Sequence, residues 1–75
     1  MKELLEYLLS GVLGDEKFQI DETEEDGRII YTIKTDPKNV GIIIGKGGRM
    51  IKSIRSLLKV RATLEKKAVA LNIGE

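Results

Sequence analysis

The sequence predicts an α+β fold in which one helix, two strands, two further helices and a last strand follow one another along 75 residues. Three observations support this order. Leucines near the N-terminus recur at helical spacing, an Asp26-Gly27 pair separates two alternating segments, and a glycine cluster divides two apolar helical segments. So short a chain forms one domain, residues 1–75, because independent domains rarely have fewer than about fifty residues.

The first expected element is an amphipathic helix over residues 1–12, which glycines at positions 11 and 14 end. Its polar side is acidic, which disfavours binding to an anionic membrane surface. We therefore expect its apolar side to pack in the core. That side is made of residues spaced three or four apart: Leu4, Leu5, Leu8, Leu9 and Val12.

Residues 17–24 and 28–35 alternate apolar and polar side chains, the pattern of two half-buried strands. The Asp26-Gly27 pair between them is typical of a two-residue hairpin turn, since both residues tolerate positive φ. The acidic residues from Asp21 to Asp26 lack the spacing and the closing glutamate of a calcium loop. We interpret them as a solvent-exposed cluster at the tip of the hairpin.

The second half of the chain contains two expected helices and a strand. Asp36-Pro37 is typical of a helix start, because aspartate caps free amides and proline fits the first turn. This helix should run over 37–43, and the next from about 48 or 49 to 58. Its apolar side is formed by Ile51, Ile54 and Leu58, flanked by Met50 and Leu57. Alternation over 63–73 predicts the last strand.

The composition excludes several kinds of chemistry. The chain has no cysteine and no histidine, so disulfides, thiolate or imidazole metal sites and histidine-dependent catalysis are ruled out. The serines, lysines and carboxylates form no catalytic motif, and we expect neither enzymatic activity nor a cofactor or metal. We also expect no membrane association and a cytoplasmic location, since apolar runs are short and the N-terminus lacks a signal-peptide pattern.

Charge is divided between the two halves of the chain. Residues 1–35 contain four basic and nine acidic residues, a net charge of −5, whereas residues 36–67 contain nine basic and two acidic residues, a net charge of +7. Such asymmetry indicates a surface that binds an anionic partner, although solvated lysines that promote solubility would produce the same count.

Gly45-Lys46-Gly47-Gly48 places three glycines within four residues, between two apolar helical segments. A tight helix–helix turn would need one glycine, so three indicate that a ligand approaches the backbone closely. The spacing does not fit a phosphate-binding P-loop or the dinucleotide-binding fingerprint. It does fit a helix–loop–helix clamp on a nucleic-acid backbone, in which amides at the start of the second helix face phosphate.

The twelve residues from Ile43 to Ile54, IIGKGGRMIKSI, resemble the core of KH domains, in which an apolar pair precedes a GxxG loop. The element order is similar to the type II KH fold, a three-stranded sheet packed on three helices. The whole chain resembles the small bacterial KH proteins that partner a larger Jag-type RNA-binding protein. This resemblance implies an RNA chaperone in post-transcriptional regulation, with roles in cell-wall homeostasis and cell shape.

In KH domains the GxxG loop clamps about four nucleotides, and their bases lie over an apolar groove. The backbone contacts then belong to Gly45, Lys46, Gly47, Gly48 and Arg49, with Lys52 on the next helical turn. For the groove floor the resemblance implies a set of apolar residues, each of which also has an alternative role in the core: Ile43 or Ile44, Ile51 or Ile54, and part of the strand Ile29–Ile33 with Tyr31.

The expected ligand is single-stranded RNA, with single-stranded DNA as a second candidate. A-form duplexes should bind poorly, because their stacked bases cannot enter a groove. The alternative function is a protein-interaction module. It would form a homodimer or a heterocomplex with the larger Jag-type KH protein, and RNA binding would be secondary or would depend on that partner.

Overall fold

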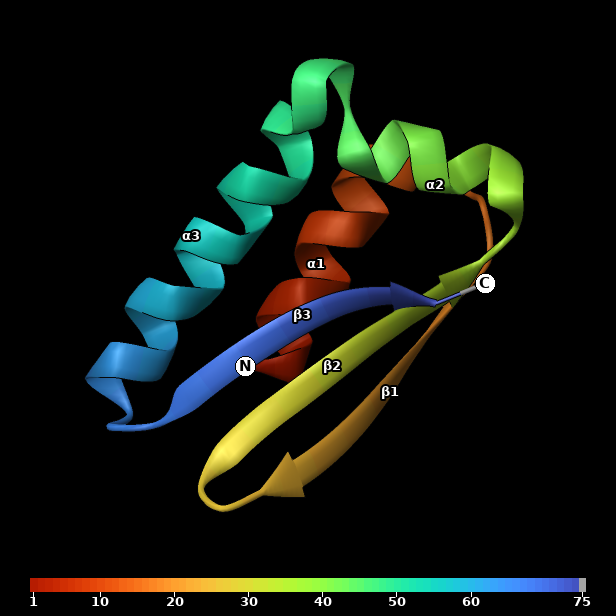
Figure 1. The fold of residues 1–75 in the computed structure, drawn as a ribbon. Coiled ribbons are helices and arrows are strands. Elements are labelled where there is room, and N and C mark those ends of the chain that lie inside the picture. Colours follow the sequence, from red (N-terminus) through yellow and green to blue (C-terminus); the bar gives the residue numbers. More distant parts are fainter. Residues whose placement is uncertain (75) are drawn as a thin grey trace.

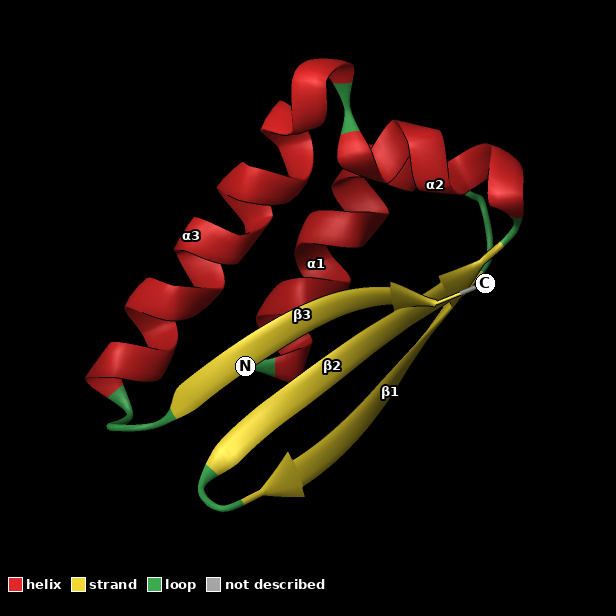
Figure 2. Ribbon diagram, in the orientation of Figure 1, coloured by secondary structure: helices red, strands yellow, loops and turns green. Residues whose placement is uncertain are grey.

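The computed structural model describes residues 1–74 and confirms the predicted α+β class and element order. Figure 1 shows the course of the chain, and Figure 2 shows that the helices all lie on one side of the sheet. The elements are α1 (Lys2–Leu13), β1 (Phe18–Glu25), β2 (Arg28–Thr35), α2 (Pro37–Ile44), a short 3₁₀ turn (Lys46–Gly48), α3 (Arg49–Leu64) and β3 (Ala68–Gly74).

The sheet has the order β1-β2-β3, so β2 is central and β3 forms an edge. β1 and β2 pair antiparallel through the tight turn, and Asp26 and Gly27 both have positive φ as the sequence predicts. β2 and β3 pair parallel, which requires the crossover that α2 and α3 provide. This arrangement is that of a type II KH fold.

The core lies between the sheet and the helices. Alternate residues of the central strand, Ile29, Tyr31 and Ile33, point toward the helices and are buried. The leucine stripe of α1 is confirmed as core for Leu5 and Leu9, which are fully buried. The helices α2 and α3 complete the core with Ile43, Ile51, Ile54, Leu58 and Ala62.

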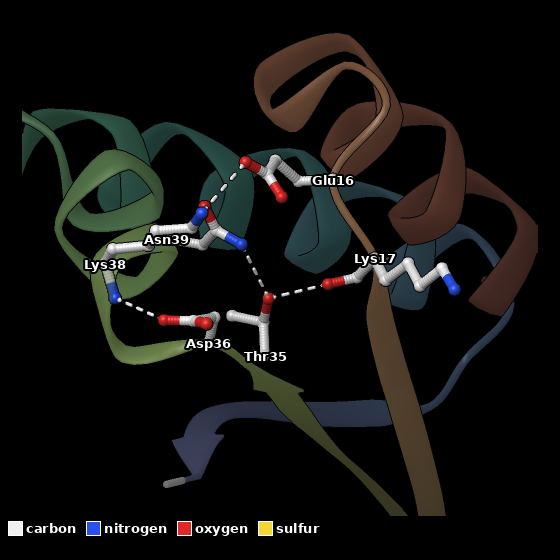
Figure 3. Close-up of polar contacts among 6 residues, drawn as sticks. All are labelled: Glu16, Lys17, Thr35, Asp36, Lys38 and Asn39. Atoms are coloured by element: carbon white, nitrogen blue, oxygen red, sulfur yellow. Dashed lines mark hydrogen bonds and ion pairs between the residues drawn. The ribbon is translucent and has the colours of Figure 1, made fainter.

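The start of α2 is tied to the base of the hairpin by polar contacts (Figure 3). The Asp36 carboxylate accepts a hydrogen bond from the Lys38 amide at 3.1 Å, which confirms the predicted cap. The Thr35 hydroxyl donates to the Lys17 carbonyl at 2.8 Å and accepts from the side-chain amide of the buried Asn39 at 3.1 Å. The Lys38 ammonium also lies 3.5 Å from the Glu16 carboxylate. These contacts hold α2, and therefore the glycine loop that follows it, against β1 and β2.

Two predicted bounds are wrong: the end of the helix that follows the glycine loop, and the start of the last strand. α3 continues to Leu64 instead of ending near Leu58, and β3 begins at Ala68 instead of position 63. Ala62 lies one turn beyond Leu58 and extends the buried side of the helix. The Thr63 hydroxyl donates to the Lys59 carbonyl at 2.9 Å, so this β-branched residue has a hydrogen-bond partner for its hydroxyl within the helix.

The acidic residues of the hairpin lie mainly in β1 rather than in a loop, and all are at least partly exposed. The Asp21 carboxylate lies 2.7 Å from the Lys34 ammonium of the neighbouring strand, and this contact, with the Gln19 amide, lowers the pKa of Asp21. Among the residues that the structure describes, no helix is long and apolar enough to cross a membrane.

Candidate nucleic-acid interface

The glycine loop joins α2 to α3 at one end of the molecule (Figure 1). Gly45, Gly47 and Gly48 have φ of 75°, 65° and 76°, the left-handed region that favours glycine. The inference that one glycine suffices for this turn is therefore wrong. The shape of the loop requires all three, whether or not a ligand is bound.

The three glycines differ in the space around them. A Cβ at Gly45 would lie 2.7 Å from the Met50 Cβ, so this position is filled by the start of α3. A Cβ at Gly47 or Gly48 would meet nothing within 4 Å. Lys46 and Gly47 are exposed, so the outer half of the loop leaves its main chain open to an approaching ligand.

The start of α3 is electropositive. Within residues 1–74 no side chain caps its first amides, and its first turn carries no acidic residue. The positive end of the helix dipole therefore adds to the charges of Lys46 and Arg49, which are both exposed. The Gly48 amide donates to the Gly45 carbonyl at 3.2 Å and the Arg49 amide to the Lys46 carbonyl. The exposed Gly47 main chain, beside two cations and the positive end of the helix dipole, is therefore the part of the loop that suits a phosphate group.

A basic surface continues along α3 on the side that faces β3. Lys52, Arg55 and Lys59 are spaced three and four residues apart and therefore share one side of the helix. The sequence placed Lys52 in the site but did not identify Arg55 or Lys59. Their helical spacing after Arg49 is the signal that could have found them.

Two hollows lie along the inward side of β3. The first has a volume of about 480 Å³ and is mainly apolar, and the second, between α3 and β3, has about 290 Å³. Ile73 lines the first hollow and Leu71 lines the second, so both hollows lie along β3. The first is lined by Thr35, Pro37, Val40, Ile44 and Ile73, and the second by Arg55, Leu58, Lys59, Val69, Ala70 and Leu71.

The structure separates the apolar residues that the sequence grouped at the groove. Ile44 is partly exposed and lines the first hollow, whereas Ile43, Ile51 and Ile54 are buried in the core. These three residues therefore occupy the alternative position that the sequence allowed for each of them, the core.

The prediction that part of the strand Ile29–Ile33 forms the floor of the groove is wrong. This segment lies in the central strand β2, and the strand beside α3 is β3. A parallel crossover adds its last strand to the free side of the first, so β3 separates β2 from the groove. Tyr31 is 2% exposed, and burial, reinforced by Glu22, raises its pKa to about 12. It is therefore a neutral core residue and not a stacking platform.

Comparison with known proteins places the chain in a family. The model of the KhpA/KhpB KH domain matches residues 2–73. The chain is 34% identical to RNA-binding protein KhpA of Oceanobacillus iheyensis over 74 residues, 97% of this chain and 99% of that protein. It is 38% identical to RNA-binding protein KhpA of Chlamydia pneumoniae over 76 aligned positions, which cover 100% and 97% of the two chains. The protein of the same name from Thermotoga maritima is 44% identical over 59 residues, 77% of this chain and 79% of that one. With its type II order and its GxxG loop between α2 and α3, the chain belongs to the KhpA/KhpB KH-domain family.

Proposed function

We propose that this protein binds single-stranded RNA, holding the phosphate backbone at Gly45-Lys46-Gly47-Gly48 and seating bases in the groove along β3. The observation that carries the proposal is the open space around Gly47 and Gly48, next to the start of α3, which no side chain within residues 1–74 caps. Relatives named as RNA-binding proteins over almost the whole chain support it.

The glycine loop and the groove along β3 contribute to RNA binding in different ways. Lys46, Arg49 and Lys52 attract phosphates, which fixes the strand in place but carries no sequence information. The apolar surface of Ile44 and Ile73 buries unstacked bases. A stacked A-form duplex cannot supply such bases, and single-stranded DNA can bind wherever the 2′-hydroxyl is not contacted.

A small open groove provides modest affinity, in the micromolar range, and broad sequence tolerance. These properties suit an RNA chaperone in post-transcriptional regulation, acting in the cytoplasm without catalysis. Roles in cell-wall homeostasis and cell shape would then follow from the transcripts that it binds. Crosslinking the protein to RNA in cells and sequencing the attached transcripts tests this level of the proposal.

The Lys52→Ala variant tests whether the bound RNA strand passes along the first turns of α3. It should weaken binding to all sequences alike and reduce the slope of log affinity against log salt by about 0.7, the share of one single-strand phosphate. Fluorescence anisotropy with labelled oligonucleotides at several salt concentrations measures this slope. Lys2→Ala, at the start of α1, removes the same charge away from the loop and should leave the slope unchanged. A normal slope in Lys52→Ala would place the strand elsewhere.

A second candidate function, protein pairing, is favoured by an apolar stripe on α3. Leu57, Val60 and Leu64 are 49%, 62% and 75% exposed and are spaced three and four residues apart. At about 100° per residue they lie on the opposite side of the helix from Arg55 and Lys59. A homodimer, or a heterocomplex with a larger Jag-type KH protein, formed there would leave the basic side free for RNA.

Sedimentation velocity tests the pairing. We expect a complex both for the protein alone and for its mixture with a Jag-type KH protein. In Leu57→Glu the association constant of that complex should fall at least tenfold. Ser56→Glu adds the same charge beside the stripe and should have little effect. If Leu57→Glu associates as the unaltered protein does, the stripe is not the interface.

A further inference from the structure

The outer edge of β1 carries main-chain groups with which no strand pairs within residues 1–74. The order β1-β2-β3 makes β1 an edge strand, and the helices lie on one face of the sheet (Figure 2). β1 spans Phe18–Glu25, contains no proline and pairs with β2 without a bulge. The opposite edge, β3, is contacted by α3, since Arg55 Nη2 donates to the Leu71 carbonyl at 3.4 Å. β1 therefore offers an open template, eight residues long, to which a further strand can pair.

The hairpin identifies the residues whose main chain points to this open edge. The turn has two residues, so the amides and carbonyls of the pair that flanks it, Glu25 and Arg28, lie between β1 and β2. The direction alternates along a strand, so the main-chain groups of Ile20, Glu22 and Glu24 point outward. The side chains of these three residues share the helix side of the sheet, because Ile20 is buried in the core.

The side chains of β1 favour a positively charged partner strand. The strand has no basic residue, and within residues 1–74 the exposed Glu22, Glu24 and Glu25 form no ion pair. A second copy that paired its β1 with this β1 would place carboxylates opposite one another, which destabilises a sheet. Lysine or arginine on an added strand would instead lie opposite these carboxylates.

A hollow beside the first half of β1 has room for an apolar side chain. It lies between α1 and β1, has a volume of about 370 Å³ and is lined by Lys2, Glu6, Phe18, Gln19 and Ile20. Phe18 and Ile20 supply its apolar wall, and Lys2 and Glu6 carry opposite charges. A residue that is placed opposite Ile20 on an added strand would direct its side chain to the same side of the sheet, toward this hollow.

We infer that the outer edge of β1 binds an extended segment of another protein, with an apolar residue opposite Ile20 and lysine or arginine opposite Glu22 and Glu24. Main-chain hydrogen bonds supply affinity, and the hollow and the carboxylates supply selectivity. β1 and β3 are the two opposite edges of the sheet, so this site is separate from the groove proposed for RNA. The inference does not depend on the RNA-binding proposal.

A synthetic peptide tests the site. The peptide Lys-Arg-Thr-Arg-Thr-Val-Thr-Val, aligned antiparallel to β1, places its second arginine opposite Glu22 and its first valine opposite Ile20. Anisotropy titration of the labelled peptide with the full chain should show binding at least about tenfold tighter than that of a peptide with glutamate at the three basic positions.

N-methylated peptides test the main-chain pairing without altering the protein. In the bound peptide the amide of the second arginine points to β1, so N-methylation there should abolish binding. The amide of the threonine before it points away, and N-methylation there should have little effect.

Two substitutions at Glu22 separate charge from main chain. Glu22→Gln removes one carboxylate and should weaken binding of the peptide by about threefold. Glu22→Pro also removes an outward amide and should abolish binding, and proline is tolerated in an edge strand where the N–H faces away from the sheet. Thermal unfolding of each variant establishes that it is folded.

Equal binding of the basic and acidic peptides, or an equal loss from both N-methylated peptides, would overturn the inference. Equal affinities of folded Glu22→Pro and Glu22→Gln would also overturn it, since the main chain would then contribute nothing. Sedimentation velocity examines the remaining occupant, a second copy. Self-association of the protein that Glu22→Pro abolishes would assign this edge to another copy of the chain and contradict the inference.

Discussion

Replacing Lys46 and Gly47 together by aspartate is expected to abolish RNA binding while the fold remains intact. The two substitutions change the charge of the loop by −3 and place carboxylates where the phosphate backbone would lie. Hydrogen bonds to charged groups contribute about 1.5–3 kcal/mol each, so losing two of them lowers affinity by at least about a hundredfold. Anisotropy titration with single-stranded RNA measures the loss.

The structure explains why this variant should fold. Lys46 is exposed, and a Cβ at Gly47 meets nothing within 4 Å. Gly47 has φ 65° and ψ 18°, a left-handed conformation that aspartate and asparagine adopt more readily than other residues. The Lys46→Asn/Gly47→Asn variant is the matched control, because it has nearly the same shape without the negative charges. It should retain measurable binding. Unchanged RNA affinity in the folded aspartate variant would refute the clamp.

Gly45→Ala is expected to have the largest effect on stability, about 3 kcal/mol or more. Gly45 combines φ 75° with ψ 177°, a region that is essentially restricted to glycine and costs other residues about 1–3 kcal/mol. The new Cβ would also lie 2.7 Å from the Met50 Cβ and 3.0 Å from the Met50 amide nitrogen. Relieving that clash requires α3 to shift, which adds a cost typical of overpacking.

Urea unfolding, followed by circular dichroism, measures this loss. A 75-residue domain has little stability in reserve, so a substantial fraction of Gly45→Ala should be unfolded without denaturant. Gly48→Asn is the matched control, because Gly48 has a left-handed conformation with ψ 14° and open space around it. It should cost about 1 kcal/mol. If the two variants are equally stable, the contact with Met50 is not a constraint on the loop.

The features that could be predicted from the sequence are those that depend on neighbouring residues. The turn at Asp26-Gly27, the cap at Asp36 and the positions of the glycine loop follow from local φ preferences and local hydrogen bonds. The core sides of α1 and α3 follow from helical spacing. The apolar spacing predicts the end of α3 too early, because Val60 and Leu64 are exposed and lie outside the buried side of the helix.

The local sequence determined the element order, the glycine loop and the basic spacing along α3, since backbone preferences and helical periodicity act over a few residues. Only the tertiary structure decided that β3 borders the groove, that Gly45 is packed while Gly47 and Gly48 are open, and that Arg55 reaches Leu71. Each of these depends on which segments, distant in the chain, are brought together. That outcome is set by the free edge of β2 and the parallel crossover, and by no residue in isolation.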